Sequence, residues 1–492
     1  MHNFISTIKQ KYQANPLLFI MLIAIVPRLI AVLFAKGYGM HDDHFWTVQW
    51  MQNLLDDFNY IDSIKPDILL YPFIQFFIFW ISELLNIFDP QAKMYLVRFF
   101  HSIYSLLIVF FGYKITLLIS TEKNAKYVGI ILALLWMLPY MCVRNLVEMF
   151  VVPPMLAAIY YVIKGDKNNN YKHFIIAGIF IAIAFTMRFQ TAFIPLGIGL
   201  AMLYEKQFKH FFILAATSII IAALILSIPE YIFWGKPFIS LITAFDIKNV
   251  DSFPNNPWYM TTLLLIAALI PPMSVFFLFA FFKSWKKYLI LFLPAFFFLV
   301  FHSIFPNKQE RFILTIIPLF VIIGTIGWNN FTEKSNFWNK NKKLLKANLL
   351  WFWSINTILM LVFVFSYSKK TRVESLYYLS DKYVTGVVIE TNENYFPPTF
   401  YLGENRNKPI YLLQGNYEIT DLKTQIDTNQ TPNFIIFFDD NNLQNRLLHF
   451  KQNYQCNLLL QKEIEPGLLD KILHFTNPKH NKNYTAFVYS IE

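Results

Sequence analysis

Long apolar stretches recur through the first three quarters of the chain, and short polar segments separate them. A transmembrane helix needs about 20 mostly apolar residues, whereas a transmembrane strand shows a short run of alternating polarity. The pattern therefore predicts an all-α polytopic membrane region. The apolar segments lie near residues 16–36, 68–88, 95–119, 127–143, 149–163, 173–187, 191–204, 211–228, 259–282, 288–304, 312–328 and 347–367.

Lysines between these segments indicate which of them cross the membrane, because cytoplasmic loops carry an excess of Lys and Arg. Lys9 and Lys11 place the N-terminus on the cytoplasmic side. The lysine-rich loops can all lie on the cytoplasmic side only if one of these apolar segments does not cross the membrane. The best candidate is 68–88, where Pro72 and Glu83 interrupt an aromatic run that suits an interfacial or re-entrant helix. About 11 transmembrane helices remain, and both the loop after the first helix and the C-terminal region face outward.

The composition changes to that of a soluble domain from about Lys369. Lys369, Lys370 and Arg372 open this region, and as cations on the outer side they run against the orientation assigned above. Alternating and amphipathic stretches predict a small α/β domain over residues 369–492, after a membrane domain over residues 1–368. The expected strands are Thr385–Glu390, Pro409–Leu413, Asn433–Phe438 and Tyr484–Ser490, and the expected helices are Leu443–Phe450 and Pro466–Phe475.

Charge distribution, cysteine count and the lack of repeats argue against several other interpretations of the chain. The net charge of +11 does not indicate a nucleic-acid partner, because the lysines fall in short loops where they orient the chain. Two cysteines, Cys142 and Cys456, imply no disulfide framework. The membrane part shows no internal repeat, which counts against transporter folds built from duplicated halves.

The stretch from Gly37 to Asp67 holds the first candidate site, at His41-Asp42-Asp43-His44. Adjacent carboxylates at a membrane surface are costly to hold against lipid and suggest a use. Asp43, with Asp42 beside it, suits a general base that takes the proton of an attacking hydroxyl. Two alternatives remain. The aspartates can cap the following helix, or the cluster can hold a divalent cation, although contiguous residues converge poorly on one ion.

Lys308, Glu310 and Arg311 form a second candidate, at the outward end of a predicted helix. Arg grips phosphate oxygens with two donors, and positive charge stabilises a departing phosphate, while Glu310 can hold the cations in place. Simple snorkelling of Lys and Arg at a helix end is the alternative.

Arg144, Glu148 and Arg188 complete the candidates. Arg144 and Glu148 are four residues apart and can pair along one helix face, which would order the site. Arg188 interrupts an apolar stretch and must find a partner or water, so it is a candidate for supporting a bound phosphate.

Two motifs resemble those of the family-22 mannosyltransferases, which extend asparagine-linked glycans and GPI anchors. His41-Asp42-Asp43-His44-Phe45 resembles the family's His-Pro-Asp-Glu motif, and Asn307-Lys308-Gln309-Glu310-Arg311-Phe312 with Pro318 resembles its His-Lys-Glu-Glu-Arg-Phe motif. Pro257-Trp258-Tyr259 and Arg188 in its membrane setting also fit. The chain departs from the family at Asp42, which replaces proline, at His44, which replaces an acidic residue, and at Asn307, which replaces histidine. The resemblance covers roughly residues 16–330.

The resemblance implies a GT-C fold and a donor sugar carried on a polyprenyl or dolichyl phosphate. It also implies transfer with inversion and without a metal or cofactor, with the base in the first outward loop. By position, Asp43 matches the motif aspartate, and Lys308, Glu310 and Arg311 match the second motif. His41 and His44 would support the base. The C-terminal domain lies outside the resemblance.

We therefore expect an integral-membrane glycosyltransferase that moves a hexose, mannose first among them, to a hydroxyl of a glycan or lipid-linked acceptor. The rivals are a transporter or flippase of lipid-linked sugars and an inactive family member that serves as a binding subunit. Charged residues gathered at one face favour the enzyme over the transporter. The expected location is a bacterial cytoplasmic membrane, with the site and the C-terminal domain on the periplasmic side.

Overall fold

The computed structural model describes residues 15–39, 44–64, 66–245, 256–305, 308–391, 396–414, 431–478, 481–482 and 484–492. The chain forms two compact units, each assembled from segments distant in the sequence. The first unit comprises Met1–Val32, Asp57–Ile74 and Arg98–Val364, and the second comprises Leu33–Asp56, Gln75–Val97 and Phe365–Glu492.

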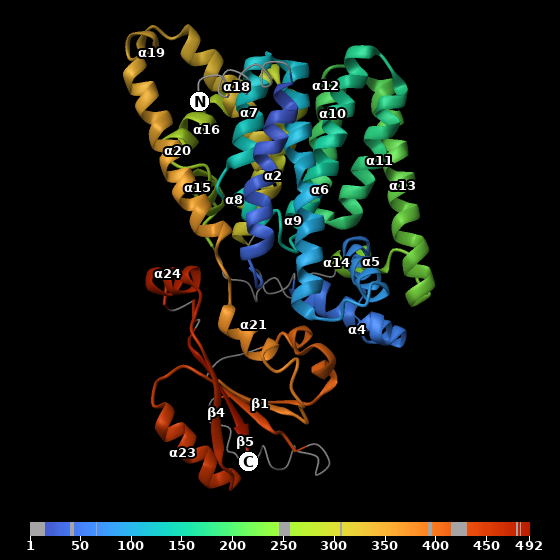
Figure 1. The fold of residues 1–492 in the computed structure, drawn as a ribbon. Helices are drawn as coiled ribbons and strands as arrows, with labels where there is room; N and C mark the ends of the chain where they lie inside the picture. The colour runs from blue at the N-terminus through green and yellow to red at the C-terminus, as the bar shows by residue number, and fades with distance from the viewer. Residues whose placement is uncertain are drawn as a thin grey trace. The chain divides into compact units, whose positions relative to one another are not determined.

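The first unit is helical (Figure 1). Within it α11 packs against α10 and α13, α12 against α17, and α16 against α18. Its α-helices are most of α2 (Pro16–Phe34), the larger part of α6 (Pro90–Ile119), α7 (Glu122–Leu134), α8 (Met137–Met141), α9 (Val147–Phe150), α10 (Val152–Asn168), α11 (Tyr171–Met187), α12 (Phe193–Tyr204), α13 (Phe208–Trp234), α14 (Ile239–Phe245), α15 (Met260–Ala268), α16 (Met273–Lys283), α17 (Leu289–Ile304), α18 (Ile317–Lys334), α19 (Asn336–Lys340) and α20 (Lys342–Val364). Short 3-10 turns are η2 (Phe58–Ser63), η3 (Phe189–Ala192), η5 (Trp285–Lys287) and η6 (Glu310–Thr315).

Of the described helical segments, five are long and apolar enough to cross a membrane: α2, α6, α9 with α10, α13 and α20. A sixth arises if α15 and α16, bent by 117° at Pro271–Pro272, count as one span. Proline cannot continue a helix, which accounts for the break. The prediction of an all-α polytopic membrane region is confirmed, but the count of about 11 spans is not. Several apolar segments form helices too short to span alone, among them α5 (Leu70–Leu84), which covers the predicted 68–88 segment.

Arg28 is a buried charged residue of the first unit whose donors have close partners. Arg28 is fully buried in α2, and its Nε donates to Ser105 Oγ at 3.0 Å. Its Nη1 donates to the carbonyl oxygens of Ala24 and Ala133, each at 2.9 Å. These bonds offset the cost of burying a charge. Arg28 was not among the predicted residues, although a lone Arg inside an apolar span is a sequence signal for a buried partner.

The second unit contains a mixed sheet (Figure 1). Its described part has five strands in the order β2-β1-β3-β5-β4. Strand β1 runs parallel to both β2 and β3, and β5 runs antiparallel to β3 and β4. The predicted α/β domain is confirmed as this small mixed sheet with helices. The described strands are β1 (Val387–Thr391), β2 (Ile410–Gln414), β3 (Phe434–Phe438), β4 (Leu458–Ile464) and β5 (Ala486–Ile491), and the described helices of the C-terminal segment are α21 (Lys370–Tyr377), α23 (Leu443–Tyr454), α24 (Leu468–Thr476) and the 3-10 segment η7 (Thr399–Asn407).

Strand β4 has no counterpart among the expected strands. Its middle carries Gln461, Lys462 and Glu463, and its burial is low along most of its length. The strand lies at one edge of the described sheet and pairs only with β5 there, so its sequence shows little of the alternation that a half-buried strand would show.

The two faces of the sheet pack against different parts of the chain. On one face, Val388, Ile435 and Phe437 contact a cluster that includes Leu447 and Phe450 of α23. On the other face, Val387, Ile389 and Ile436 join a core with residues from the N-terminal third. That core includes Tyr38, Val48, Phe79, Met94 and Tyr401. Segments 33–56 and 75–97 therefore share a hydrophobic core with the sheet, and the boundary predicted at 368/369 stays a prediction.

Candidate active site

The loop that follows α2 is only partly described. His41, Asp42 and Asp43, the predicted catalytic residues and their neighbour, lie outside the described residues. The chain is described again from His44, which begins the π-helical turn η1 (His44–Gln49). The contacts of His44 therefore show how the chain is held at the position that follows Asp43.

His44 lies between two tyrosine rings of the second unit. Its ring stacks on Tyr38 with centroids 4.6 Å apart and on Tyr401 with centroids 5.4 Å apart, at interplanar angles of 15° and 5°. Phe400 adds an edge contact at 6.3 Å, and His44 is buried. Burial also raises the pKa of the Tyr38 phenol to about 12, so this ring stays neutral at physiological pH. A residue of η7 thus helps to hold the residue that follows Asp43.

A buried polar network holds α4 (Trp50–Asp56), the helix that follows η1. Lys93 Nζ donates to Glu83 Oε1 at 2.6 Å and to Gln52 Oε1 at 2.8 Å, and the Lys93 side chain is 2% exposed. Gln52 Nε2 donates to Glu83 and to Asp56. Arg406 of η7 forms an ion pair with Asp56. The network ties α4 to α5, to the start of α6 and to η7.

In the first unit, Glu148 of α9 contacts two arginines. Its Oε1 lies 2.9 Å from Arg188 Nη2 and 3.1 Å from Arg311 Nε, and the Glu148 side chain is 0% exposed. Arg188 is the C-cap of α11, with extended backbone angles that end the helix, and Arg311 lies in η6. One carboxylate faces two guanidiniums, so this cluster carries one excess positive charge.

The other predicted residues of this region lie near the same elements. Arg144 is buried, with its guanidinium carbon 4.1 Å from the centroid of the Tyr140 ring. Lys308 is partly buried, and its Nζ donates to the carbonyl oxygen of Phe305 at 2.9 Å. Glu310 begins η6 and is exposed. Among the described residues, Arg311 is held by Glu148, and the role predicted for Glu310 stays a prediction.

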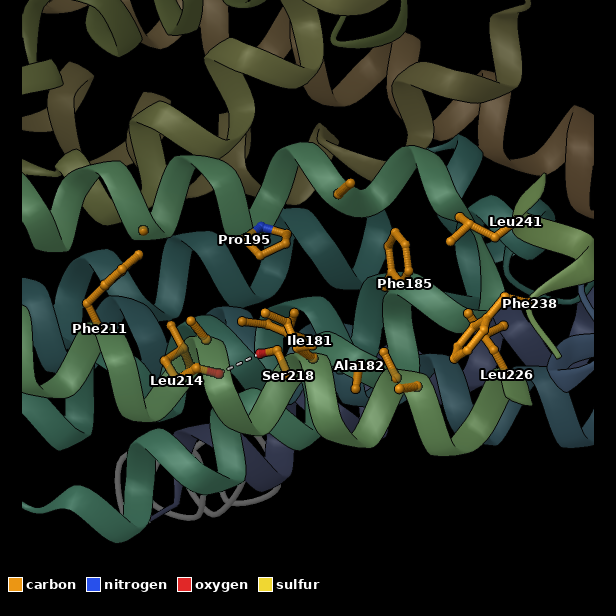
Figure 2. A pocket seen from close by; sticks show the side chains of 16 residues that line it. Ile181, Ala182, Phe185, Pro195, Phe211, Leu214, Ser218, Leu226, Phe238 and Leu241 are labelled. Atoms are coloured by element: carbon orange, nitrogen blue, oxygen red, sulfur yellow. Dashed lines mark hydrogen bonds between the residues drawn. The ribbon is translucent and has the colours of Figure 1, made fainter. Parts of the chain in front are cut away.

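An apolar cavity of about 390 Å³ lies in the first unit between α11, α12, α13 and α14 (Figure 2). Figure 2 shows Ile181, Phe185 and Leu226 among its lining side chains. Ser218 contributes one of the few polar groups, but its hydroxyl already donates to the Leu214 carbonyl oxygen at 2.8 Å. Phe185 precedes Arg188 by less than one helical turn, so the cavity and the arginine share the end of α11.

Two contributions to the region were not predicted. Tyr401 lies in the C-terminal segment, where an aromatic residue is ordinary core material, so no local signal marks it as a partner of His44. Lys93 and Glu83 fall on neighbouring helices, and their pairing depends on how α5 and α6 pack. Glu83 carried a partial signal, as a carboxylate within an otherwise apolar run.

Comparisons with known proteins bear on what this arrangement does. The model of the Alg9-like mannosyltransferase family matches residues 9–394, so the resemblance inferred from the two motifs is confirmed. A GPI alpha-1,2-mannosyltransferase 3 from Bos taurus is 21% identical over 324 residues, which cover 64% of this chain. The match spans 59% of that relative's length.

Solved structures of two further proteins share the fold. ArnT from Cupriavidus metallidurans bound to undecaprenyl phosphate matches with a TM-score of 0.65 at 10% identity, covering 96% of this chain and 97% of that one. The oligosaccharyltransferase of Archaeoglobus fulgidus, in complex with Zn and sulfate, matches with a TM-score of 0.56 at 10% identity, covering 88% and 69%. At such identities the likeness concerns the fold, and it agrees with the expected GT-C architecture.

Proposed function

Because this chain belongs to the Alg9-like mannosyltransferase family, we propose that it is an integral-membrane glycosyltransferase that uses a lipid-linked sugar. It moves a hexose, mannose first among them, from a polyprenyl- or dolichyl-phosphate donor to a hydroxyl of a glycan or lipid-linked acceptor. The observation that carries the proposal is the buried cluster of Glu148, Arg188 and Arg311. Its excess positive charge in a chain of apolar helices suits an anionic lipid headgroup.

In this proposal the arginines bind the donor phosphate. Glu148 uses a single oxygen for Arg188 Nη2 and Arg311 Nε, which holds the two guanidiniums close together, and each guanidinium carries five N–H donors. Lys308 adds a cation close to Arg311 in the chain. As the bond between the anomeric carbon and the phosphate oxygen breaks, negative charge grows on the phosphate, and these cations stabilise it.

The apolar cavity supports a donor that carries a long hydrocarbon chain (Figure 2). A polyprenyl tail needs an apolar surface, and its phosphate needs cations at the end of that surface. Phe185 in the cavity wall and Arg188 at the cap of the same helix offer this sequence of environments. A nucleotide-sugar donor carries no long hydrocarbon chain that could be buried against this apolar wall.

Asp43 is the proposed general base, with Asp42 as its neighbour. It takes the proton of the acceptor hydroxyl as that oxygen attacks the anomeric carbon from the face opposite the leaving phosphate, which inverts the configuration. His41 and His44 support the loop, and Arg144 orders the neighbouring turn. No metal or cofactor takes part in this scheme. We further propose that the site and the C-terminal domain face the periplasmic side of a bacterial cytoplasmic membrane.

Replacing Tyr401 by leucine is expected to lower kcat by about 10-fold, with a smaller change in KM for the donor. Leucine fills much of the space but removes the ring that stacks on His44. A displacement of about 1 Å at a reacting group can cost about 10²-fold, and loosening the residue after Asp43 should cost part of that. Steady-state kinetics with varied donor would measure the split. Tyr401→Phe keeps the stack and serves as the control. An unchanged kcat in Tyr401→Leu would remove the stack from any positioning role.

The proposed activity is tested with purified protein in nanodiscs, a panel of polyprenyl-phosphate hexoses and a lipid-linked acceptor extract. Transfer from one donor, with a product of inverted anomeric configuration, is the expected result. Movement of lipid-linked sugar across proteoliposomes without any transfer would assign the chain to the transporters. Binding of a donor with neither transfer nor movement would indicate an inactive binding subunit.

A further inference from the structure

Helix α24 in the second unit carries an exposed apolar stripe. Leu468, Ile472 and Phe475 are 63%, 40% and 88% exposed, and their spacing places them on one face of the helix. Leu473 adjoins them and is 37% exposed. A stripe of large apolar side chains on a helix of nine residues is unusual for a surface in water.

The opposite face of α24 is fixed to the segment that follows the last membrane helix. Asp470 is 1% exposed, and its carboxylate accepts the backbone N–H groups of Lys369 at 2.9 Å and Lys370 at 3.1 Å. Gly467 lies directly against the same segment, since a Cβ there would fall 2.3 Å from the carbonyl oxygen of Tyr367. The stripe therefore points away from the chain at the point where α24 is attached.

The attachment point is close to the membrane by covalent connection. Tyr367 follows Val364, the last residue of the candidate span α20, by three residues, which limits its distance from that residue to about 11 Å. Ser368 N–H also donates to the carbonyl oxygen of Lys36 at 3.1 Å, and Lys36 follows the end of the candidate span α2 by two residues. The ends of two spans thus meet where α24 is held.

Side chains at this junction are of the kind found at membrane interfaces. Lys36 Nζ lies 5.5 Å from the ring centroid of Tyr95 and 5.9 Å from that of Tyr367. Tyrosine and lysine concentrate at the headgroup level of bilayers. Lys471 lies beside the stripe and pairs with the exposed Glu465 at 2.6 Å, and the exposed Lys482 follows α24 in the chain.

We propose that α24 is an interfacial anchor, whose stripe of Leu468, Ile472 and Phe475 enters the bilayer surface and holds the sheet-bearing unit against it. The occupant of the stripe is the lipid bilayer. Interfacial helices bury their apolar face about 5–10 Å into the boundary between headgroups and acyl chains. The anchor does not depend on the proposed transferase activity, because it follows from the exposed stripe and from the covalent path to α20 and α2.

Nitroxide labels on single cysteines test the anchor in nanodiscs of zwitterionic and anionic phospholipid. In a Cys142→Ala/Cys456→Ser background, labels at Phe475→Cys and Leu468→Cys should collide more with oxygen, which concentrates among acyl chains, than with a water-soluble nickel chelate. Leu448→Cys on α23 is the matched control, because Leu448 is also exposed, at 54%, and should show the opposite preference. Leu468 and Phe475 are exposed, so the cysteines and labels at these two positions leave the core intact.

Two results would overturn the anchor. Labels on the stripe that prefer the nickel chelate as strongly as the Leu448→Cys label would place α24 in water. Labels shielded from both reagents would show that protein covers the stripe, such as a second copy of this chain. Neither reading uses a sugar donor, so failure of the anchor is distinguishable from failure of the proposed transferase activity.

Discussion

Asp43→Asn is expected to lower kcat for sugar transfer by about 10²- to 10⁴-fold, the usual contribution of a general base. Asparagine has nearly the same shape, so the loop should keep its form, but its amide cannot accept the proton of the attacking hydroxyl. Donor binding should be retained, because the cations proposed for the phosphate lie elsewhere in the chain. The measurement compares single-turnover transfer and donor binding for wild type and variant.

Asp42→Asn is the matched control for Asp43→Asn. The two residues are neighbours with the same side chain, so a shared effect of loop charge would appear in both variants. A loss confined to Asp43→Asn would identify the base. Transfer that survives unchanged in Asp43→Asn would remove this residue from the role and turn attention to Asp42 or Glu148.

Glu148→Ala is expected to cost about 3–5 kcal/mol of stability and to abolish transfer, because removing one partner of a buried ion pair strands the other charge, and here it strands two. The change leaves Arg188 and Arg311 without the carboxylate oxygen that both contact, in a site where the two arginine side chains are 15% and 8% exposed. Thermal unfolding in detergent, followed by intrinsic fluorescence, would measure the loss. Glu148→Gln keeps an acceptor oxygen and should lie between wild type and Glu148→Ala.

Glu333→Ala provides the comparison for Glu148→Ala. Glu333 pairs with Lys123 at 2.8 Å, a distance close to that of the Glu148 pairs, but the two side chains are 59% and 60% exposed. Exposed pairs contribute about 0–1 kcal/mol, so this variant should unfold almost as wild type does. Equal stability of Glu148→Ala and Glu333→Ala would show that the buried cluster does not stabilise the fold.

Much of the architecture follows from local sequence pattern. Apolar runs predicted the membrane helices, and the change of composition near Lys369 predicted the domain with the mixed sheet. The number of membrane spans did not follow from the apolar runs. An apolar run shows that a segment avoids water, but α11 and α17 are short and α15 and α16 are bent at a break, features that depend on caps, prolines and neighbouring helices.

In the candidate site, too, some features follow from local sequence pattern and others depend on tertiary packing. The motif around Lys308 and Arg311 identified the family before any fold was known, because motif residues are close together in the chain. The partners of the site residues could not be identified from local motifs. Glu148 joins Arg188 and Arg311, and Tyr401 stacks on His44, although these residues lie far apart in the sequence. Local periodicity reports which face of a segment is buried, whereas the partner of a buried charge or ring is chosen by how distant segments pack together.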